Sequence, residues 1–329
     1  MTQGAPIGAP PEPIDLGHGS WLLDSRLAGE PGVVGVFVRT LADGRVALIE
    51  AASGATVPTV LRGLGALGLG PEDVAGIFVT HVHLDHAAGA GGLCAWADAP
   101  VFVHPDGARH LHDPSRLWNS AARLYGDAMD RLWGPMRPVP EELLRPLPDG
   151  RTLTLGGTPF RVLHTPGHAR HHLSLIDDRG DAYVGDAAGI RLPGVPKIRP
   201  ALPPPETDLE ALDASLDRLR AETPARLLLT HFGAFDDVDA HLEAASSRAR
   251  AWGQEVLAGL RAGEDEAALV RRMERLEDAE LDADGVADPD LRRRTKGSSD
   301  AAMTVAGLSR YWRKLRPDAL VEGGSRGGP

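Results

Sequence analysis

The chain has 329 residues, of which 42% are hydrophobic and 25% charged, as in an ordinary globular protein with room for one large α/β unit and a smaller appendage. Its formal net charge of -11 leaves no basic surface for a phosphate backbone, which argues against nucleic acid as a partner. No apolar run is long enough to span a membrane, and the N-terminus does not resemble a signal peptide. We therefore expect a cytoplasmic protein that does not bind membranes.

Strand patterns dominate the first third of the chain. Residues 1–13 are rich in proline, glycine and alanine and are predicted to form a disordered arm. The apolar spacing of residues 57–67 predicts a helix. Cys94 is the only cysteine; it excludes an intrachain disulfide and a thiolate metal site, and we expect it to be buried. β-Branched runs predict strands at residues 33–38, 46–50, 76–80 and 101–103.

Residues 108–145 are predicted to be a helical insertion near the substrate pocket. Large apolar side chains recur there at helical spacing, which favours a stripe that faces the core. We expect a minority of these side chains to line the pocket instead. They are Trp118, Tyr125, Met129, Trp133 and Met136.

A second group of strand patterns predicts a second sheet. A helix over residues 208–222 is expected before the last of these strands, and Thr207 with Glu210 predicts a capping box at its start. Two strand-rich halves that each carry helices predict an α+β fold, in which two sheets pack face to face and helices cover their outer faces. The predicted strands are residues 152–155, 160–163, 173–176, 182–185 and 226–229.

The chain becomes helical beyond Gly233. Apolar residues at spacings of three and four predict helices over residues 238–260, from residue 269 onward and over residues 300–315. Residues 236–318 are therefore predicted to be a helical C-terminal extension, and the glycine-rich residues 319–329 a disordered tail. The extension is a candidate homodimer interface or pocket wall.

The segment THVHLDHAAG, at residues 80–89, places four potential metal ligands within six positions. Residues i and i+2 of an extended chain point the same way, so His81 and His83 can bind one ion at the end of the preceding strand. The chain then turns, and Asp85 and His86 would face a point a few ångströms away. This arrangement indicates a second ion.

The remaining ligands must come from elsewhere, because one segment cannot complete two coordination shells. Three further candidates each follow an apolar strand, as the first segment does. They are His168, Asp186 and His231. Since each follows a strand end, a sheet edge could bring them together with the first segment.

The ordered motifs HVHLDH, TPGH, VGDA and THFG resemble those of the metallo-β-lactamase superfamily, and within it the hydrolases similar to glyoxalase II. The resemblance covers roughly residues 30–235. It implies a four-layer αββα sandwich, the predicted catalytic domain over residues 14–235, with a dinuclear metal centre at the sheet edges. One ion would bind His81, His83 and His168, and the other Asp85, His86 and His231, with Asp186 as the bridge.

The same resemblance implies supporting roles for residues near the ligands. The ligand is the histidine after Pro-Gly, which is His168; His164, His171 and His172 are left as supporting or surface groups, with His172 expected nearest the site. Glu50 departs from the pattern, since many members have aspartate at this strand end. That acidic position normally supports the ligands rather than binding metal.

Two divalent ions with these donors suit hydrolysis of a small-molecule substrate. Zinc is the default for histidine-rich sites, and iron or manganese is an alternative. Paired ions about 3.5 to 4 Å apart activate a shared water and stabilise an oxyanion. Asp85 is the expected catalytic carboxylate, because its free oxygen could orient the hydroxide. The carbonyl attacked would belong to a thioester, ester or lactone.

Other reactions on the same ligands stay open. The main alternative is an iron-dependent oxidoreductase similar to persulfide dioxygenases. A di-iron oxygen reductase is disfavoured because its relatives generally have glutamate where this chain has His83, and a nuclease is disfavoured by the acidic charge. Among hydrolases, the substrate-reading features of glyoxalase II are not recognisable in the extension. The tyrosine that follows the bridging aspartate in many homoserine-lactone lactonases is also missing, since Ala187 and Ala188 follow Asp186.

Overall fold

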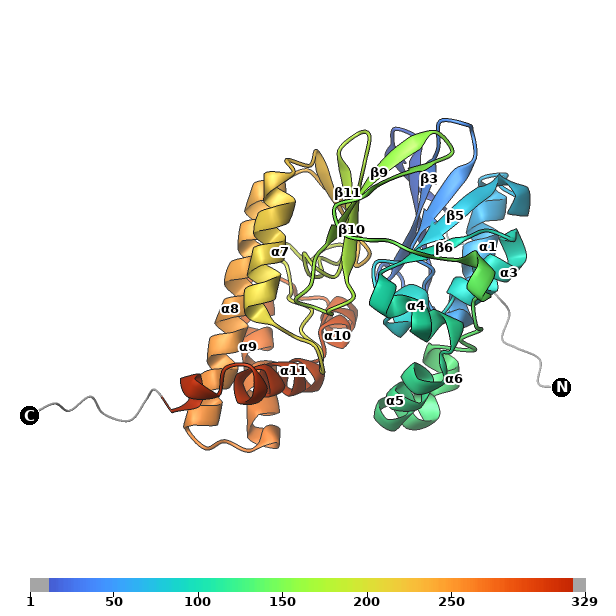
Figure 1. The fold of residues 1–329 in the computed structure, drawn as a ribbon. Coiled ribbons are helices and arrows are strands. Elements are labelled where there is room, and N and C mark those ends of the chain that lie inside the picture. The colour runs from blue at the N-terminus through green and yellow to red at the C-terminus, as the bar shows by residue number, and fades with distance from the viewer. Residues whose placement is uncertain (1–11, 322–329) are drawn as a thin grey trace, which may run out of the picture.

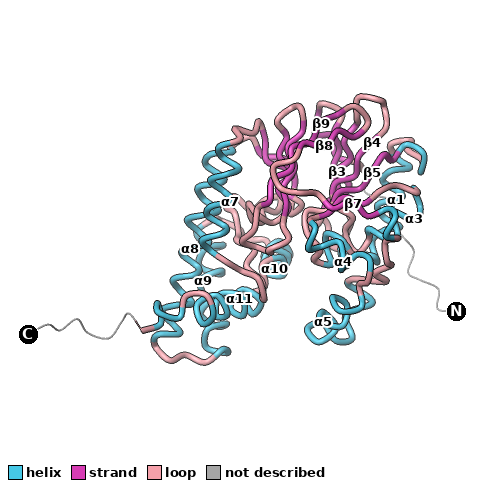
Figure 2. Tube along the Cα trace, in the orientation of Figure 1, coloured by secondary structure: helices cyan, strands magenta, loops and turns pink. Residues whose placement is uncertain are grey.

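Two mixed β-sheets pack face to face, with helices on their outer faces, in the computed structural model, which describes residues 12–321 (Figure 1). Strands occupy the centre of the molecule and helices flank them (Figure 2). The predicted four-layer arrangement with a helical C-terminal region is confirmed. No helix among the described residues combines the length and the apolar character that a membrane crossing needs.

The first sheet comes from the N-terminal half of the chain and has the order β1-β2-β3-β4-β5-β6-β7. Its strands pair antiparallel up to β4 and parallel from β4 to β7, so the carboxyl ends of β4 and β5 meet at one edge. Helices α1 (Val57–Ala66) and α3 (Ala90–Ala97) cover its outer face in one apolar cluster. The strands are β1 Ile14–Gly17, β2 Ser20–Asp24, β3 Gly35–Thr40, β4 Val46–Ile49, β5 Val74–Phe78, β6 Val101–Val103 and β7 Leu144–Pro146.

The second sheet has the order β13-β12-β11-β10-β9-β8, and only its β11–β12 pair is parallel. Its outer face is covered by α7 together with the C-terminal helices α8, α9 and α11, which share one apolar cluster with strand residues such as Val184 and Leu229. The strands are β8 Thr152–Leu155, β9 Thr158–His164, β10 Leu173–Asp177, β11 Asp181–Gly185, β12 Arg226–Leu229 and β13 Gly233–Phe235. The helices are α7 Leu209–Ala221, α8 Val238–Arg261, α9 Glu266–Ala283, α10 Pro289–Ser298 and α11 Ala301–Lys314.

Aromatic side chains fill the space between the sheets. Phe37 meets Tyr183 with ring centroids 5.4 Å apart, and Phe78 meets Phe160 at 5.1 Å. Strands β4 and β5 are buried along their whole length, because one face meets the opposite sheet and the other meets helices. The loops that leave these strands therefore start from rigid positions.

The predicted insertion consists of α4 (Pro105–His112), α5 (Ser115–Tyr125) and α6 (Met129–Leu132), followed by a connection to β7. Met129, Trp133 and Met136 are buried against the first sheet, as a core-facing stripe requires. Tyr125 is only partly buried. In Figure 1, α5 and α6 lie below the first sheet, opposite α10 and α11.

The predicted capping box at the start of α7 is wrong. Asp208 is the N-cap, and its carboxylate accepts a hydrogen bond from the Ala211 amide at 3.1 Å. The Thr207 hydroxyl instead donates to the Pro203 carbonyl at 2.8 Å and closes the preceding turn. Glu210 accepts a 2.5 Å hydrogen bond from the Tyr311 hydroxyl, so it links α7 to α11.

The predicted terminal segments fall mainly outside the described residues. Of the predicted arm, only its last two residues are described, and β1 begins directly after them at Ile14. Of the predicted tail, its first residues complete a short 3₁₀ helix, Pro317–Leu320. The division of the chain into a catalytic domain and an extension stays a prediction.

A buried ion pair anchors the corner between α10 and α11. Arg199 lies in the segment that follows β11, and its guanidinium is 2.5 Å from the carboxylate of Glu277 on α9. These side chains are only 2% and 1% exposed. Arg199 also donates to the Ser299 hydroxyl at 2.8 Å and lies over the Trp252 ring of α8. The network thus joins a loop of the second sheet to α8, to α9 and to the residue that follows α10.

Replacing Glu277 by alanine should destabilise the fold by about 3–5 kcal/mol, because the buried charge of Arg199 would lose its closest partner and keep only the more distant carboxylate of Glu280, at 3.7 Å. Urea unfolding monitored by circular dichroism measures this difference. Asp217, an exposed partner of Arg220 on α7, provides the control, and Asp217→Ala should stay within about 0.5 kcal/mol of the wild type. Equal losses in the two variants would contradict a special role for the buried pair.

Candidate metal centre

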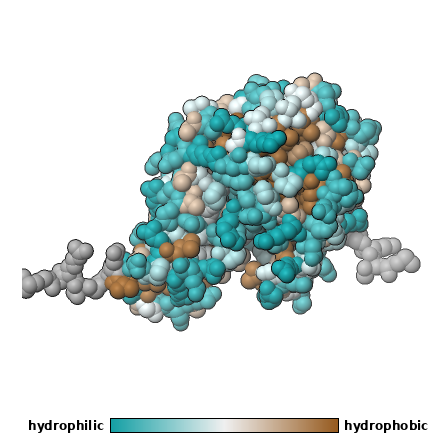
Figure 3. Space-filling model, in the orientation of Figure 1, coloured by the Kyte–Doolittle hydropathy of each residue, from teal (hydrophilic) through white to brown (hydrophobic). Residues whose placement is uncertain are grey.

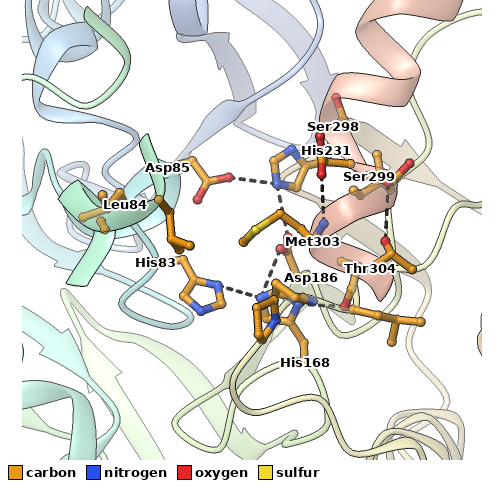
Figure 4. Close-up of a pocket in the computed structure, with 18 of the residues that line it drawn as sticks. His83, Leu84, Asp85, His168, Asp186, His231, Ser298, Ser299, Met303 and Thr304 are labelled. Atoms are coloured by element: carbon orange, nitrogen blue, oxygen red, sulfur yellow. Dashed lines mark hydrogen bonds and ion pairs between the residues drawn. The ribbon is translucent and has the colours of Figure 1, made fainter. Parts of the chain in front are cut away.

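All seven residues predicted as ligands lie together at one edge of the sandwich. The segments that carry them follow the strand ends of β5, β9, β11 and β12. Figure 4 labels those of them that also line the cavity, and these side chains point toward one another: His83, Asp85, His168, Asp186 and His231. The seven are His81, His83, Asp85, His86, His168, Asp186 and His231.

The HVHLDH segment differs in one respect from the expectation. Strand β5 ends at Phe78, two residues before the predicted end, so His81 and His83 lie in a loop rather than at the strand end. The short helix α2 (Leu84–Ala87) then carries Asp85 and His86. The ring of His86 lies beside that of His81, with centroids 4.1 Å apart, while the carboxylate of Asp85 faces His231.

The first donor group consists of three imidazole nitrogens that face one another. His81 Nε2 lies 2.9 Å from His83 Nδ1 and 3.1 Å from His168 Nε2, and the last two atoms are 2.8 Å apart. Nδ1 of His168 donates to the Ala201 carbonyl at 2.9 Å. In the neutral ring, Nε2 of His168 therefore carries a lone pair directed at the other two rings.

The second donor group consists of Asp85, His86 and His231, whose ligand atoms all lie within 4.8 Å of one another. Oδ2 of Asp85 is 3.5 Å from His231 Nε2 and 3.7 Å from His86 Nε2. Nδ1 of His231 donates to the Val33 carbonyl at 2.7 Å. This contact orients the other ring nitrogen toward the carboxylates.

Asp186 lies between the two groups. Its Oδ1 is 3.3 Å from Nε2 of both His86 and His231, and its Oδ2 is 3.4 Å from Nε2 of His168. The carboxylate thus faces the second group with one oxygen and the first group with the other. This is the position that a bridging ligand needs.

The donor set fits two cations. Three imidazole lone pairs at mutual distances near 3 Å repel one another unless a proton or a cation lies between them. Nε2 of His86 and Oδ1 of Asp186 are buried and make no hydrogen bond within the described residues, although buried polar atoms are normally paired. Imidazole nitrogens and carboxylate oxygens are also the donors of protein zinc sites.

The charges of the centre point the same way. Burial lowers the pKa of His81 and of His83 well below the ordinary histidine value, so both rings are neutral. Burial also lowers the pKa of His231, but Asp186 and Asp85 outweigh it and raise that pKa to about 10. In the absence of a cation, protons on the second group therefore balance the carboxylates. A divalent cation can replace those protons, because metal binding requires neutral imidazoles.

Glu50, which directly follows β4, forms hydrogen bonds that support this centre. It is fully buried and accepts hydrogen bonds from the Thr80 hydroxyl at 2.6 Å, His86 Nδ1 at 2.9 Å and the Thr230 hydroxyl at 3.0 Å. The Thr80 amide adds a fourth bond at 3.2 Å. Glu50 does not belong to either donor group, in agreement with the supporting role expected for it.

The other histidines of the TPGH region lie at increasing distances from the donors. His172 is buried and accepts a hydrogen bond from the Asp186 amide at 3.2 Å, so it is next to the site as expected. The ring of His171 is about 6 Å from those of His81 and His83. His164 bonds to the Leu147 carbonyl and packs against His104 instead, with the two rings tilted by 44°.

Sequence reasoning missed the hydrogen-bond partners that orient the donors. The hydroxyls of Thr80 and Thr230 hold Glu50, and the Thr165 hydroxyl lies 2.8 Å from His172 Nδ1. A signal was present, since a threonine directly precedes both His81 and His231. The Val33 and Ala201 carbonyls carry no such signal, because a main-chain acceptor is independent of residue type.

A cavity of about 300 Å³ opens beside the donors. His83, Asp85, His168, Asp186 and His231 form its floor, and the walls come from α5, the loop at residues 201–205 and the α10–α11 corner. Met303 of α11 lines the same cavity and is drawn among the donors in Figure 4. The insertion and the C-terminal helices thus provide opposite walls of one site.

The sequence matches the family model of the metallo-beta-lactamase superfamily over residues 28–231. Among curated proteins, the metallo-beta-lactamase fold-containing protein ST1585 of Sulfurisphaera tokodaii is 32% identical over 132 residues, which cover 39% of this chain and 49% of that protein. A hydroxyacylglutathione hydrolase of Idiomarina loihiensis is 26% identical over 125 residues, 37% of each chain. The chain thus matches about half of the length of these relatives or less.

Solved structures share the fold at low sequence identity. The metallo-beta-lactamase family protein TTHA1429 of Thermus thermophilus gives a TM-score of 0.66 at 24% identity and covers 92% of this chain and 95% of its own. ST1585 gives 0.60 at 23% identity, with 70% and 86% covered. MEM-A1, a subclass B3 metallo-beta-lactamase from a soil metagenome library, gives 0.55 at 20% identity, with 74% and 95% covered.

The purified protein should bind about two divalent ions per chain, and His83→Ala should retain about one, because only the first donor group loses a ligand. Metal content measured by inductively coupled plasma mass spectrometry tests this. His164→Ala is the matched control and should keep both ions, since His164 lies away from the donors. A full complement of metal in His83→Ala would contradict the grouping.

Glu50→Gln should weaken metal binding by roughly 10- to 100-fold, because the partner that orients His86 Nδ1 loses its charge. Competition with a chromogenic chelator gives the affinity. Glu243 on α8 is 74% exposed, so Glu243→Gln should leave the affinity unchanged. Identical affinities in all three proteins would show that Glu50 does not tune the donors.

Proposed function

The chain belongs to the metallo-β-lactamase superfamily, and from this we propose that it is a dinuclear metal-dependent hydrolase of thioesters, esters or lactones. The observation that carries the proposal is the pair of donor groups that share Asp186. Two adjacent groups suit the two-ion chemistry of hydrolysis better than a structural metal site, because the cavity leaves the donors accessible from one side.

When bound, two divalent ions would act as Lewis acids, lowering the pKa of a water toward neutrality and stabilising negative charge on an attacked carbonyl. The residues of the chain supply position and proton acceptance. Oδ2 of Asp85 faces His231 and His86, which leaves Oδ1 to accept a hydrogen bond from the attacking water and to orient it. The side chain of Asp85 is 23% exposed, so it can reach both water and substrate.

Asp85 is also suited to its role by charge. Burial raises the pKa of Asp85, but the neighbouring His86 and His231 outweigh burial and lower that pKa below the ordinary aspartate value. The carboxylate is therefore ionised at neutral pH and can act as an acceptor. No protein nucleophile is needed, and Cys94, on α3, is buried in the core of the first sheet.

Zinc is the metal proposed for both positions. Imidazole nitrogen and carboxylate oxygen donors suit zinc, although iron and manganese accept the same mixture. Because all three metals accept these donors, the test includes reconstitution with each of them. Calcium and magnesium are poor candidates because they prefer oxygen donors.

The carbonyl substrate class is supported by two relatives. One curated relative is named a hydroxyacylglutathione hydrolase, and one structural neighbour is named a metallo-beta-lactamase. A glutathione thioester is not proposed here, since the match to that relative covers 37% of its length. An iron-dependent persulfide dioxygenase-like reaction is the second candidate. It is the weaker one because it uses one iron per chain, whereas Asp85, His86 and His231 offer a second ion site.

The metal-loaded enzyme should hydrolyse at least one class in a panel of thioesters, esters and lactones, and Asp186→Ala should reduce this activity to the background rate. Asp186 contacts both donor groups, so its loss removes a ligand shared by both ions. His164→Ala is the control and should retain activity. The assay is spectrophotometric release of thiol, nitrophenol or acid, after reconstitution with zinc, manganese or iron.

Two results would reject the proposal in different ways. Full activity in Asp186→Ala would show that hydrolysis does not depend on the assigned metal centre. One iron per chain, with oxygen consumption on a persulfide and no hydrolysis, would replace hydrolysis by the dioxygenase reaction.

A further inference from the structure

The cavity beside the donors is walled mainly by apolar side chains. Along α5, Leu117, Ala121, Leu124 and Tyr125 recur at the spacing of one helical face and all line the cavity. Trp133 also contributes to this wall. Ligand sites for small molecules range from roughly 300 to 1,000 Å³, so this cavity of about 300 Å³ is at the small end.

The opposite wall adds little polarity. The loop at residues 201–205 contributes alanine, leucine and three prolines, and α11 contributes Met303. The hydroxyls at the α10–α11 corner are engaged within the corner: Ser298 donates to the Arg294 carbonyl at 2.9 Å, and Ser299 donates to the Thr295 carbonyl at 3.3 Å. These hydroxyls are therefore not directed at a ligand.

Away from the metal centre, the cavity walls also lack a partner for an anionic group. None of its lining residues, all within the described part of the chain, is lysine or arginine. Outside the metal centre its only carboxylate is Asp300, which caps α11 by accepting from the Met303 amide at 2.9 Å. An anion held against these walls, away from the metal ions, would lose its hydration without gaining a cation, which is costly.

Basic residues lie next to lining residues on α5 and α10. Arg116 and Arg123 of α5 are exposed and do not line the cavity, and those of α10 are held by other groups. Arg293 pairs with Glu30 at 2.8 Å, and Lys296 pairs with Asp278 at 3.0 Å. Arg294 donates to the Pro31 carbonyl at 2.6 Å. These contacts direct the positive charges of α10 away from the cavity.

The polar groups on the α5 side of the cavity are neutral: the hydroxyls of Ser120 and Tyr125 and the indole N–H of Trp133, which is buried and makes no hydrogen bond within the described residues. Burial, together with the carboxylates of Asp85 and Asp300, raises the pKa of Tyr125 to about 12. Its hydroxyl is therefore a neutral group at the pH of the cell. It can donate a hydrogen bond without adding a charge to the cavity.

We infer that this cavity binds an uncharged, apolar chain of the substrate, so that the enzyme prefers neutral esters, thioesters or lactones of medium chain length over substrates that carry a carboxylate, sulfonate or phosphate. The reaction in this inference rests on the proposed function, whereas the binding does not. The volume holds roughly ten groups of the size of a water molecule. A chain of about eight carbons therefore fills the cavity once the carbonyl lies at the metal centre.

Binding of straight-chain amides tests the cavity independently of hydrolysis. Butanamide, hexanamide and octanamide are titrated into the metal-loaded full chain by calorimetry. The dissociation constant should fall by about two- to fourfold per methylene, since each buried CH₂ contributes about 0.8 kcal/mol at most. An amide of the octanamide chain length that ends in a sulfonate, a poor metal ligand, should bind at least about tenfold more weakly than octanamide.

A charge introduced into the wall should reverse this preference. Leu124 lies at the cavity rim and is 61% exposed, so Leu124→Lys should fold normally and should bring the sulfonate amide to within about threefold of octanamide. Asn119 is exposed on the same helix and does not line the cavity. Asn119→Lys is therefore the control, and its preference should match that of the wild type.

Esters then connect binding to turnover. Among nitrophenyl esters from acetate to dodecanoate, kcat/KM should rise to a maximum near eight carbons and fall beyond it. Amide binding as expected with no ester hydrolysis would reject the proposed function and leave the apolar site standing. The inference is overturned if no amide binds, if the sulfonate amide binds as tightly as octanamide, or if Asn119→Lys acts like Leu124→Lys.

Discussion

The buried carboxylate of Glu50 is the contact on which the metal centre depends. It bonds to Thr80 and His86, which follow β5 in the first sheet, and to Thr230, which follows β12 in the second. Removing this charge from water is costly unless hydrogen bonds replace its hydration, and four of them do so here. The loops of both sheets are therefore held around one carboxylate. Because these loops carry the metal donors, the carboxylate helps to fix the positions of the donors relative to one another.

The part of this centre that could be predicted from sequence is the part encoded locally. Four donors lie within the six positions of HVHLDH, and the strand patterns explain why His168, Asp186 and His231 also lie at the same edge. The partners of the donors could not be predicted in this way. The Ala201 and Val33 carbonyls that orient His168 and His231 are ordinary main-chain groups, and only the tertiary fold brings them into reach.

The wrongly predicted N-cap of α7 illustrates the same limit. Thr207 and Asp208 are adjacent and both are good N-caps, so the local pattern could not choose between them. The turn at Pro203 uses the Thr207 hydroxyl and leaves Asp208 to cap α7. The cavity walls were predicted only as segments, residues 108–145 and the C-terminal extension. The side chains that line the cavity could not be chosen from sequence, because α5 and α11 are far apart in the chain and meet the donors only in the folded structure. Hydrophobic surface is visible near the notch between the two lower projections (Figure 3), and Leu124 of α5 is 61% exposed.

The short segment at residues 199–201 serves the donors and the wall at once. Arg199 anchors the α10–α11 corner through Ser299 and Glu277, and two residues later the Ala201 carbonyl fixes the ring of His168. The wall and the ligand therefore share a mechanical support. A chimaera that exchanged the C-terminal helices for those of a relative would have to carry this segment with them, since new helices on the old segment would shift the imidazole as well as the pocket. Changes of single residues along α5 leave this support untouched, so they offer the shorter evolutionary route to a new substrate preference.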